Sequence, residues 1–344
     1  MLTFLAVDAG GTSTRAVLVT PDGTCLGYGT AGGGNPISSG IERAASAVVS
    51  ATQTATTAAG LGPSDVGGGI LAMAGSGVNP DTGWVTTALA GAGYPGTVEL
   101  RSDLLATFFS GTFEAEGYAL VAGTGSAGIR VRSGIVDRAA DGLGWLLGDV
   151  GSGFWIGHRV AREVVAALDG RAEPTAMTAS LLDALGLDSD LWIDADGRPG
   201  VLRLVTDALY RLRPVELSRF APIAFAAHDD AAARAILAEA AEALARLFGA
   251  VASPELTGPL VLGGSILAQK SVVADAVATA ATASGLVPET RQVPDGVIGV
   301  EIGYDQKKPV TEVFQAQGFV LLDAVRDLGG NDRVLVFHRG TAAQ

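Results

Sequence analysis

Asp8-Ala-Gly-Gly-Thr-Ser-Thr14 joins two stretches, residues 2–7 and 15–20, that are predicted to be β-strands. Its paired glycines let backbone amides crowd around an anion, and its aspartate can hold hydrated Mg²⁺. An ordinary glycine hairpin turn with a capping aspartate explains the stretch equally well on its own. The rest of the chain must therefore decide between a phosphate-binding turn and a plain one.

The same pattern returns later in the chain. Residues 118–122 are apolar, Gly123-Thr-Gly-Ser-Ala-Gly128 is a second glycine turn, and residues 129–136 alternate as a strand. A dinucleotide-binding G-x-G-x-x-G would need a helix opening at its last glycine, and the alternation argues against one. We therefore predict two halves that each begin with a glycine-tipped hairpin.

A third glycine turn, Gly263-Gly264-Ser265, follows a predicted strand at 259–262 and precedes a helix. Its backbone could lie flat against an adenine or ribose, although a tight strand-to-helix turn fits equally well. A strand is also predicted at 69–74. Helical periodicity predicts further helices at 41–59, 154–168, 177–185, 201–212, 229–252 and 310–328.

Bulk properties exclude several classes of protein. The 344 residues are 48% hydrophobic and 17% charged, which excludes a disordered chain and allows two domains. A net charge of −13 without a basic block argues against nucleic acid as a partner. Asp8 interrupts the apolar start, and no run of 18 apolar residues follows, so we expect a cytoplasmic protein without a membrane partner.

Several kinds of chemistry are excluded by the absence of their motifs. One cysteine, Cys25, and three histidines provide neither an internal disulfide nor a zinc site, so any metal must be held by oxygen. The sequence contains neither a G-x-x-x-x-G-K-[ST] loop nor a G-x-S-x-G elbow.

Four segments in order carry a family resemblance: Asp8 to Thr14, Arg101-Ser-Asp103, Val121 to Ser126, and Gly142-Leu-Gly-Trp-Leu-Leu-Gly-Asp149-Val-Gly-Ser152-Gly-Phe-Trp155. They resemble the N-acetylglucosamine kinase and BadF/BadG-type ATPase family. The resemblance runs from residue 2 to about 160 and resumes at Gly263. It implies the α/β actin-like ATPase fold (ribonuclease H-like), with two domains around a nucleotide- and sugar-binding cleft.

The resemblance also implies ATP and Mg²⁺ as cofactors and gives the site residues their roles. Asp103 would be the catalytic base, and it could at the same time cap a helix at 104–109, since the two roles are compatible. Asp8 would hold the metal through water. The nucleotide would be bound by Gly10, Gly11, Thr12, Thr14, Gly123, Thr124, Gly125, Ser126, Gly263, Gly264 and Ser265. The sugar would be bound by Asn35, Ser76, Asp103, Thr124, Trp145 and Asp149.

The sugar itself is predicted from departures from the family pattern. Family members commonly have Gly-Asp-Glu-Gly-Ser where this chain has Gly148-Asp-Val-Gly-Ser152, and the segment 303–318 looks longer than usual. The protonated amine of free glucosamine favours nearby carboxylates, such as those of Asp149, Asp305 and Glu312. We therefore expect phosphorylation of glucosamine to the 6-phosphate, with N-acetylglucosamine as the alternative.

A second alternative is a BadF-type ATPase that acts on a partner protein. Such activators share an iron–sulfur cluster between subunits, and a single cysteine argues against this. We expect domains at 1–107 with 311–344 and at 108–310, with a homodimer as a possible assembly.

Overall fold

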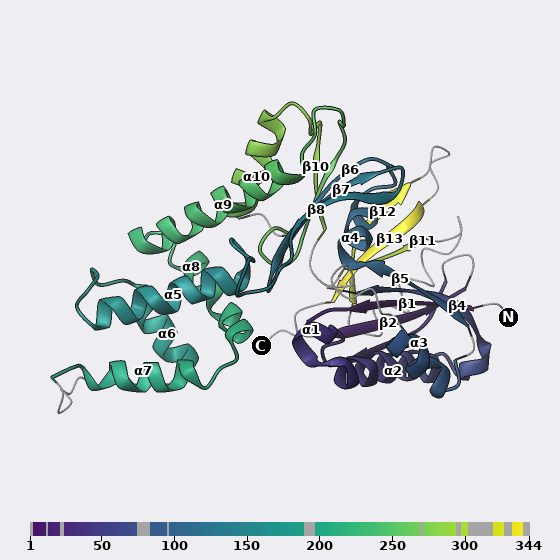
Figure 1. Cartoon of the computed structure of the whole chain (residues 1–344), viewed down its shortest axis with the longest axis horizontal. Coiled ribbons are helices and arrows are strands. Elements are labelled where there is room, and N and C mark those ends of the chain that lie inside the picture. The colour runs from purple at the N-terminus through teal and green to yellow at the C-terminus, as the bar shows by residue number, and fades with distance from the viewer. Residues whose placement is uncertain are drawn as a thin grey trace. The chain divides into compact units, whose positions relative to one another are not determined.

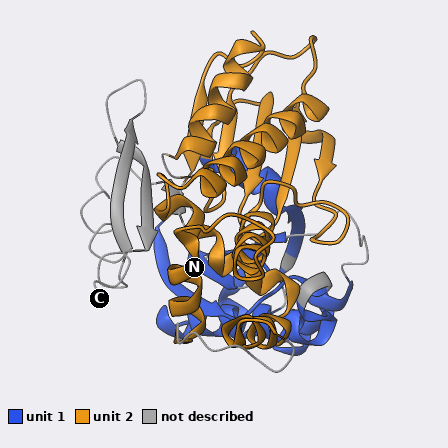
Figure 2. Cartoon of the chain, turned by 90° about the vertical axis from the view of Figure 1, so that its left-hand side faces the viewer, with its two compact units in different colours: residues 1–110, 296–344 blue, residues 111–295 orange. Residues whose placement is uncertain are grey.

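The computed structural model describes residues 3–11, 13–20, 24–73, 83–94, 96–188, 197–268, 271–293, 297–301, 319–326 and 332–339. The chain divides into two compact units (Figure 2). Unit 1 comprises Met1–Ser110 and Gly296–Gln344, and unit 2 comprises Gly111–Asp295. The sequence-based boundaries at 107/108 and 310/311 remain predictions.

Unit 1 contains a five-stranded sheet in the order β3-β2-β1-β4-β5. β1 pairs antiparallel with β2 and parallel with β4, and β4 pairs parallel with β5. The predicted strands at 2–7, 15–20 and 69–74 are confirmed over the residues that the structure describes, while β3 was not predicted. The strands are β1 (Thr3–Ala9), β2 (Thr14–Val19), β3 (Cys25–Ala31), β4 (Val66–Met73) and β5 (Thr97–Ser102).

Helices cover one face of this sheet. α2 packs against β2 and β3, and Figure 1 shows α3 on the same side. α2 buries alanines and a valine at helical spacing, and these meet the inward residues of β1, which alternate buried and exposed. The helical elements are α1 (Pro36–Ser39), α2 (Ile41–Ala58), the short 3₁₀ turn η1 (Pro63–Asp65), α3 (Gly83–Gly91) and α4 (Asp103–Gly111).

Unit 2 contains a second five-stranded sheet in the order β10-β9-β6-β7-β8. Read from β8, its strand order and directions repeat those of unit 1 from β3. The predicted repeat is thus confirmed at the level of topology. The strands are β6 (Gly117–Ala122), β7 (Ser126–Arg132), β8 (Ile135–Asp141), β9 (Leu260–Gly263) and β10 (Thr290–Val293).

The prediction of a single strand at 129–136 was wrong. Ser133 and Gly134 both have positive φ, 53° and 75°, so they turn the chain and separate β7 from β8. Two successive residues with positive φ are typical of a type I′ hairpin turn, whose twist matches that of the flanking strands. Because the residue pattern alternates on both sides of the turn, the sequence did not indicate where one strand ends and the next begins.

Helices form the rest of unit 2, and one apolar core joins them to β6 and β9. α9 and α10 lie side by side (Figure 1), and α5 packs on η2 and α8. The helical elements are α5 (Gly153–Leu168), α6 (Met177–Leu185), α7 (Gly200–Tyr210), η2 (Pro214–Phe220), α8 (Ala221–Ala226), α9 (Ala231–Val251) and α10 (Val272–Ala283). The helices predicted from 154 to 252 are confirmed, with small shifts at their ends.

The last described residues form a three-stranded antiparallel sheet in the order β11-β13-β12. Its strands are β11 (Val297–Glu301), β12 (Phe319–Arg326) and β13 (Asp332–Arg339). The helix predicted at 310–328 was therefore wrong over β12, and residues 310–318 lie outside the described residues. Leu328-Gly-Gly-Asn331 is a turn signal between two β-prone runs, and pairing between those runs prevailed over helical periodicity.

No helix in the described part of the chain combines the length and the apolar character that crossing a membrane requires.

Candidate functional site

The first glycine turn links β1 to β2 in unit 1. The Gly10 amide donates to the Ser13 carbonyl (2.9 Å), and the Gly10 carbonyl accepts from the Gly34 and Asn35 amides (2.9 and 3.1 Å). Buried Thr14 donates its hydroxyl to the Gly32 carbonyl (2.8 Å). The predicted nucleotide turn and the predicted sugar loop are thus joined, and Thr14 serves to join them.

Asp103 lies where β5 ends and α4 begins. β1, β4 and β5 run parallel, and Ala9, Met73 and Ser102 lie in register at their carboxyl ends. The Asp103 carboxylate accepts from the Leu104 amide (2.9 Å), and α4 begins at Asp103 itself, so this contact is not the N-cap bond that the sequence predicted. A carboxylate at this edge of a parallel sheet lies where α/β proteins bind ligands.

Burial raises the pKa of Asp103 to about 6, and the negative charge of Asp8 adds to the rise. A hydrogen bond from the Ser102 hydroxyl and the Leu104 amide act in the opposite direction. A carboxylate with this pKa is ionised at neutral pH, yet accepts a proton more readily than an ordinary aspartate. This is the property that a general base needs.

Asp8 projects from the exposed face of β1, because the alternate residues Val7 and Ala9 are buried. Its carboxylate is 51% exposed and lies 3.3 Å from the Arg15 guanidinium, which stands opposite it on β2. An exposed carboxylate next to a glycine turn suits Mg²⁺, which keeps several of its waters and takes few protein ligands.

The second glycine turn, between β6 and β7 in unit 2, is held from several sides. The carbonyls of Gly123 and Thr124 accept from the first amides of α5, those of Gly153 (2.7 Å) and Phe154 (3.1 Å). Among the described residues, the Thr124 and Gly125 amides donate to no protein acceptor. These two donors, with the Thr124 hydroxyl, are what the turn can offer to a phosphate.

Ser126 uses both its amide and its hydroxyl in hydrogen bonds within the protein. Its amide donates to Asp149 Oδ1 (2.9 Å), and its buried hydroxyl donates to the Val150 carbonyl (3.2 Å). Its predicted contact with a phosphate therefore has less support than that of Thr124. Asp149 is itself buried, and it lies so close to Gly125 that a Cβ there would be 2.6 Å from Asp149 Oδ1.

The third glycine turn packs on the second. Gly264 has φ +81°, and a Cβ on it would lie 2.5 Å from the Ala122 carbonyl oxygen and 2.6 Å from the Gly123 nitrogen. The Ile266 amide donates to the Ala122 carbonyl (2.8 Å). The predicted set Gly263, Gly264 and Ser265 thus adjoins the predicted set Gly123 to Ser126, at the carboxyl ends of the parallel strands β6 and β9.

Aromatic residues line the neighbouring loop and the start of α5. Trp145 is 43% exposed and contacts Phe154 edge-on, with ring centroids 6.0 Å apart, and the His158 ring stacks on Phe154. Trp155 packs against the core of unit 2 with Arg159 over its ring. Of these two tryptophans, Trp145 is therefore the one that is available to a ligand.

Thr12 and Ser76 lie outside the described residues, as do Asp305 and Glu312. Sequence reasoning missed two other residues. Ser152 caps α5 by accepting from the Trp155 amide (3.2 Å), and a serine just before a helical run could have revealed it. Asp141, at the end of β8, accepts from the Asp149 amide through both carboxylate oxygens (3.0 and 3.1 Å), and no sequence motif marks it.

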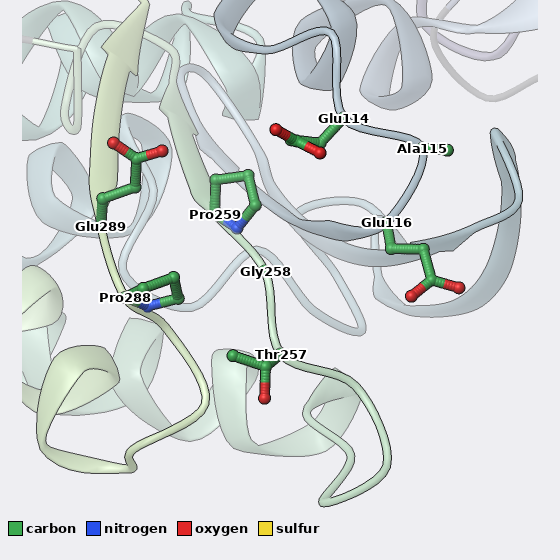
Figure 3. A pocket seen from close by; sticks show the side chains of 8 residues that line it. All are labelled: Glu114, Ala115, Glu116, Thr257, Gly258, Pro259, Pro288 and Glu289. Carbon is green, nitrogen blue, oxygen red and sulfur yellow. The ribbon is translucent and has the colours of Figure 1, made fainter.

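A pocket of about 370 Å³ in unit 2 lies elsewhere (Figure 3). Its lining includes Glu116, Pro259 and Glu289, which immediately precede β6, β9 and β10. The pocket is therefore at the amino ends of the parallel strands, whereas the glycine turns are at their carboxyl ends. Ligand sites of α/β sheets form at the carboxyl ends, so we do not assign this pocket to the reaction.

Two sheets of matching order, each with a glycine turn at its first hairpin, define the actin-like ATPase fold. Residues 5–282 match the BadF/BadG/BcrA/BcrD ATPase family. The chain belongs to that family of ATPases, which implies that it binds ATP.

Proteins similar to this chain agree with this placement. The chain is 29% identical over 188 residues to glucosamine kinase GspK of Vibrio cholerae, covering 54% of this chain and 63% of that one. It is 29% identical over 294 residues to N-acetyl-D-glucosamine kinase of Dictyostelium discoideum, covering 79% of this chain and 88% of that one. A candidate N-acetylglucosamine kinase structure from Chromobacterium violaceum is 28% identical with a TM-score of 0.63, covering 83% and 94%.

One shorter match is to an enzyme of a different class, a methyltransferase. Over 47 residues the chain is 60% identical to release factor glutamine methyltransferase of Agrobacterium fabrum, which is 14% of this chain and 16% of that enzyme. The chain thus spans less than two thirds of both that methyltransferase and the Vibrio glucosamine kinase.

Proposed function

We propose that the protein is an ATP-dependent, Mg²⁺-requiring kinase of an amino sugar. The observation that carries the proposal is Asp103, a carboxylate with a pKa raised to about 6, at the carboxyl edge of the unit 1 sheet. The Gly10 turn, Asn35 and Asp8 belong to the same edge. The glucosamine and N-acetylglucosamine kinases among the relatives support the same reaction class.

Phosphoryl transfer needs in-line positioning and neutralisation of charge rather than covalent help from the protein. Asp103 accepts the proton of the attacking sugar hydroxyl, which we propose to be the 6-hydroxyl. The Thr124 and Gly125 amides and the Gly10 turn hold the phosphates. Asp8 would hold Mg²⁺ through water, and the ion would neutralise negative charge on the phosphates.

The choice of sugar rests on carboxylates. Asn35 can donate to and accept from sugar hydroxyls, Trp145 offers an apolar wall, and Asp149 Oδ2 accepts no hydrogen bond from the described residues. A free carboxylate oxygen favours a protonated amine over an acetamido group. We therefore propose glucosamine as the preferred substrate, with N-acetylglucosamine as the alternative.

The proposal is tested by ADP production from ATP and Mg²⁺ with glucosamine, N-acetylglucosamine, glucose, mannosamine or no sugar. We expect glucosamine to give the largest stimulation, since its ammonium group pairs with a carboxylate. Stimulation by N-acetylglucosamine alone would overturn the amine preference but keep the kinase. Equal turnover with and without every sugar would overturn the kinase and favour an ATPase that acts on a partner protein.

An ATPase of that second kind would need cysteine thiolates for a shared iron–sulfur cluster. Cys25, the one cysteine of the chain, is buried in β3, and burial raises its pKa to about 11. A buried group that remains a neutral thiol is a poor cluster ligand. This observation favours the kinase.

The proposed kinase ends before β11. The family match stops at residue 282, and within the described residues β11, β12 and β13 pair only with one another. The 62 residues after residue 282 have room for the 47-residue match to the methyltransferase, and we propose that the match lies in this terminal region. The match is 16% of that enzyme, and we propose no methyl transfer for this chain.

A cleavage experiment tests this boundary. A specific protease site inserted after Val293 would let the full-length protein be assayed before and after removal of the terminal sheet. We expect kcat/KM for the sugar to change by less than about twofold, because every contact proposed from the described residues lies before Val293. Loss of activity on cleavage alone, with protease-treated wild type as the control, would show that the terminal sheet belongs to the kinase.

A further inference from the structure

The loop between β8 and α5 returns to β7 through three residues that form a closed set of hydrogen bonds. The Ser126 amide donates to Asp149 Oδ1 (2.9 Å), and the Asp149 amide donates to both Asp141 oxygens (3.0 and 3.1 Å). The Gly142 amide, next to Asp141, donates back to the Ser126 carbonyl (3.0 Å). We call Ser126, Asp141 and Asp149 the clasp.

The clasp uses backbone conformations that the chain adopts at a cost. Asp141 and Asp149 have φ values of 60° and 61°, in the left-handed region that non-glycine residues rarely occupy. Two carboxylates also lie near one another, and burial together with the charge of Asp141 raises the pKa of Asp149. These costs must be offset by what the clasp holds in place.

What the clasp holds is the second glycine turn. Asp149 lies against Gly125, and its bond to Ser126 fixes the residue that ends the turn. The free Thr124 and Gly125 amides precede Ser126 directly, so their directions depend on it. The segment that the clasp closes exposes Leu143, Leu146 and Leu147, which provide little packing of their own.

We infer that Asp141 is a positioning residue for nucleotide binding: through Asp149 it sets the Gly123–Ser126 turn to receive phosphate. The inference rests on the proposed function and adds to it a residue that contacts neither ATP nor sugar. Asp141 accepts from the Asp149 amide through both of its carboxylate oxygens, so the contact depends on the Asp141 side chain. Asp149 accordingly has a second role beside its proposed contact with the sugar.

The test measures the Kd of MgATP by calorimetry on the full-length protein, so it does not depend on turnover. Asp141→Gly removes the carboxylate and relieves the left-handed backbone, and we expect the Kd to rise about tenfold. Asp141→Asn tolerates the same backbone and keeps one acceptor, so its Kd should fall between those of Asp141→Gly and wild type. Asp137→Asn, on the same strand, removes the partner of Arg130 and should leave the Kd unchanged.

A double variant separates positioning from a general loss of structure. If Asp141 acts through Asp149, Asp141→Gly combined with Asp149→Gly should bind MgATP no more weakly than Asp149→Gly alone. Additive losses, or wild-type affinity in both Asp141→Gly and Asp141→Asn, would overturn the inference. If Asp141→Gly does not fold, wild-type affinity in Asp141→Asn is enough to overturn it. Wild-type protein that fails to bind MgATP would instead refute the proposed function.

Discussion

Asp103→Asn is expected to lower kcat by about 10²–10⁴-fold while leaving the binding of sugar and nucleotide largely intact. The carboxamide keeps the size of the side chain but cannot accept a proton from the attacking hydroxyl. Steady-state ADP production, with calorimetry for both ligands, measures this separation. In wild type, activity should fall about tenfold per pH unit below pH 6, because protonation removes the base, whose pKa is about 6.

A matched control lies on β5, the strand that directly precedes Asp103. Glu99 pairs with Arg101 (2.6 Å) and is exposed, so Glu99→Gln should leave kcat unchanged. The thermal stability of Asp103→Asn should equal or exceed that of wild type at neutral pH, since burial and Asp8 both oppose the ionised carboxylate. Wild-type turnover in Asp103→Asn would refute its role as the base.

Asp8→Asn is expected to lower turnover by about 10–100-fold at limiting Mg²⁺, with part of the loss recovered at high Mg²⁺. The amide retains an oxygen but loses the charge that attracts hydrated Mg²⁺. The same change removes the negative charge that raises the pKa of Asp103, so the acidic limb of the pH profile should move to lower pH. Turnover as a function of Mg²⁺ and of pH measures both effects.

Glu42→Gln, in the exposed first turn of α2, removes one acidic charge from the same unit and should change neither profile. An unchanged Mg²⁺ dependence in Asp8→Asn would require another metal anchor. An unchanged acidic limb would show that this limb does not report Asp103.

The sequence predicted the repeated hairpins and most of the helices of unit 2. Turn glycines and apolar periodicity are local signals, because a backbone that needs positive φ or close approach selects glycine wherever it occurs. Asp103 could be placed because it directly follows a strand, and strand ends of a parallel sheet share one edge. The prediction of a helix at 310–328 was wrong over β12, because β12 is stabilised by pairing with β13. Such pairing joins residues farther apart in sequence than one helical turn, and apolar periodicity does not report it.

Thus the residues of this chain by themselves determined the fold class, the family and the positions of the glycine turns. Only the tertiary structure decided which of these groups are free to act. In the tertiary structure Ser126 and Thr14 make hydrogen bonds within the protein, whereas the Thr124 and Gly125 amides donate to no acceptor among the described residues. The structure also shows that Asp141 accepts from the Asp149 amide. The physical reason is that a hydrogen bond depends on which groups the fold brings within about 3 Å, and such pairs can be far apart in sequence.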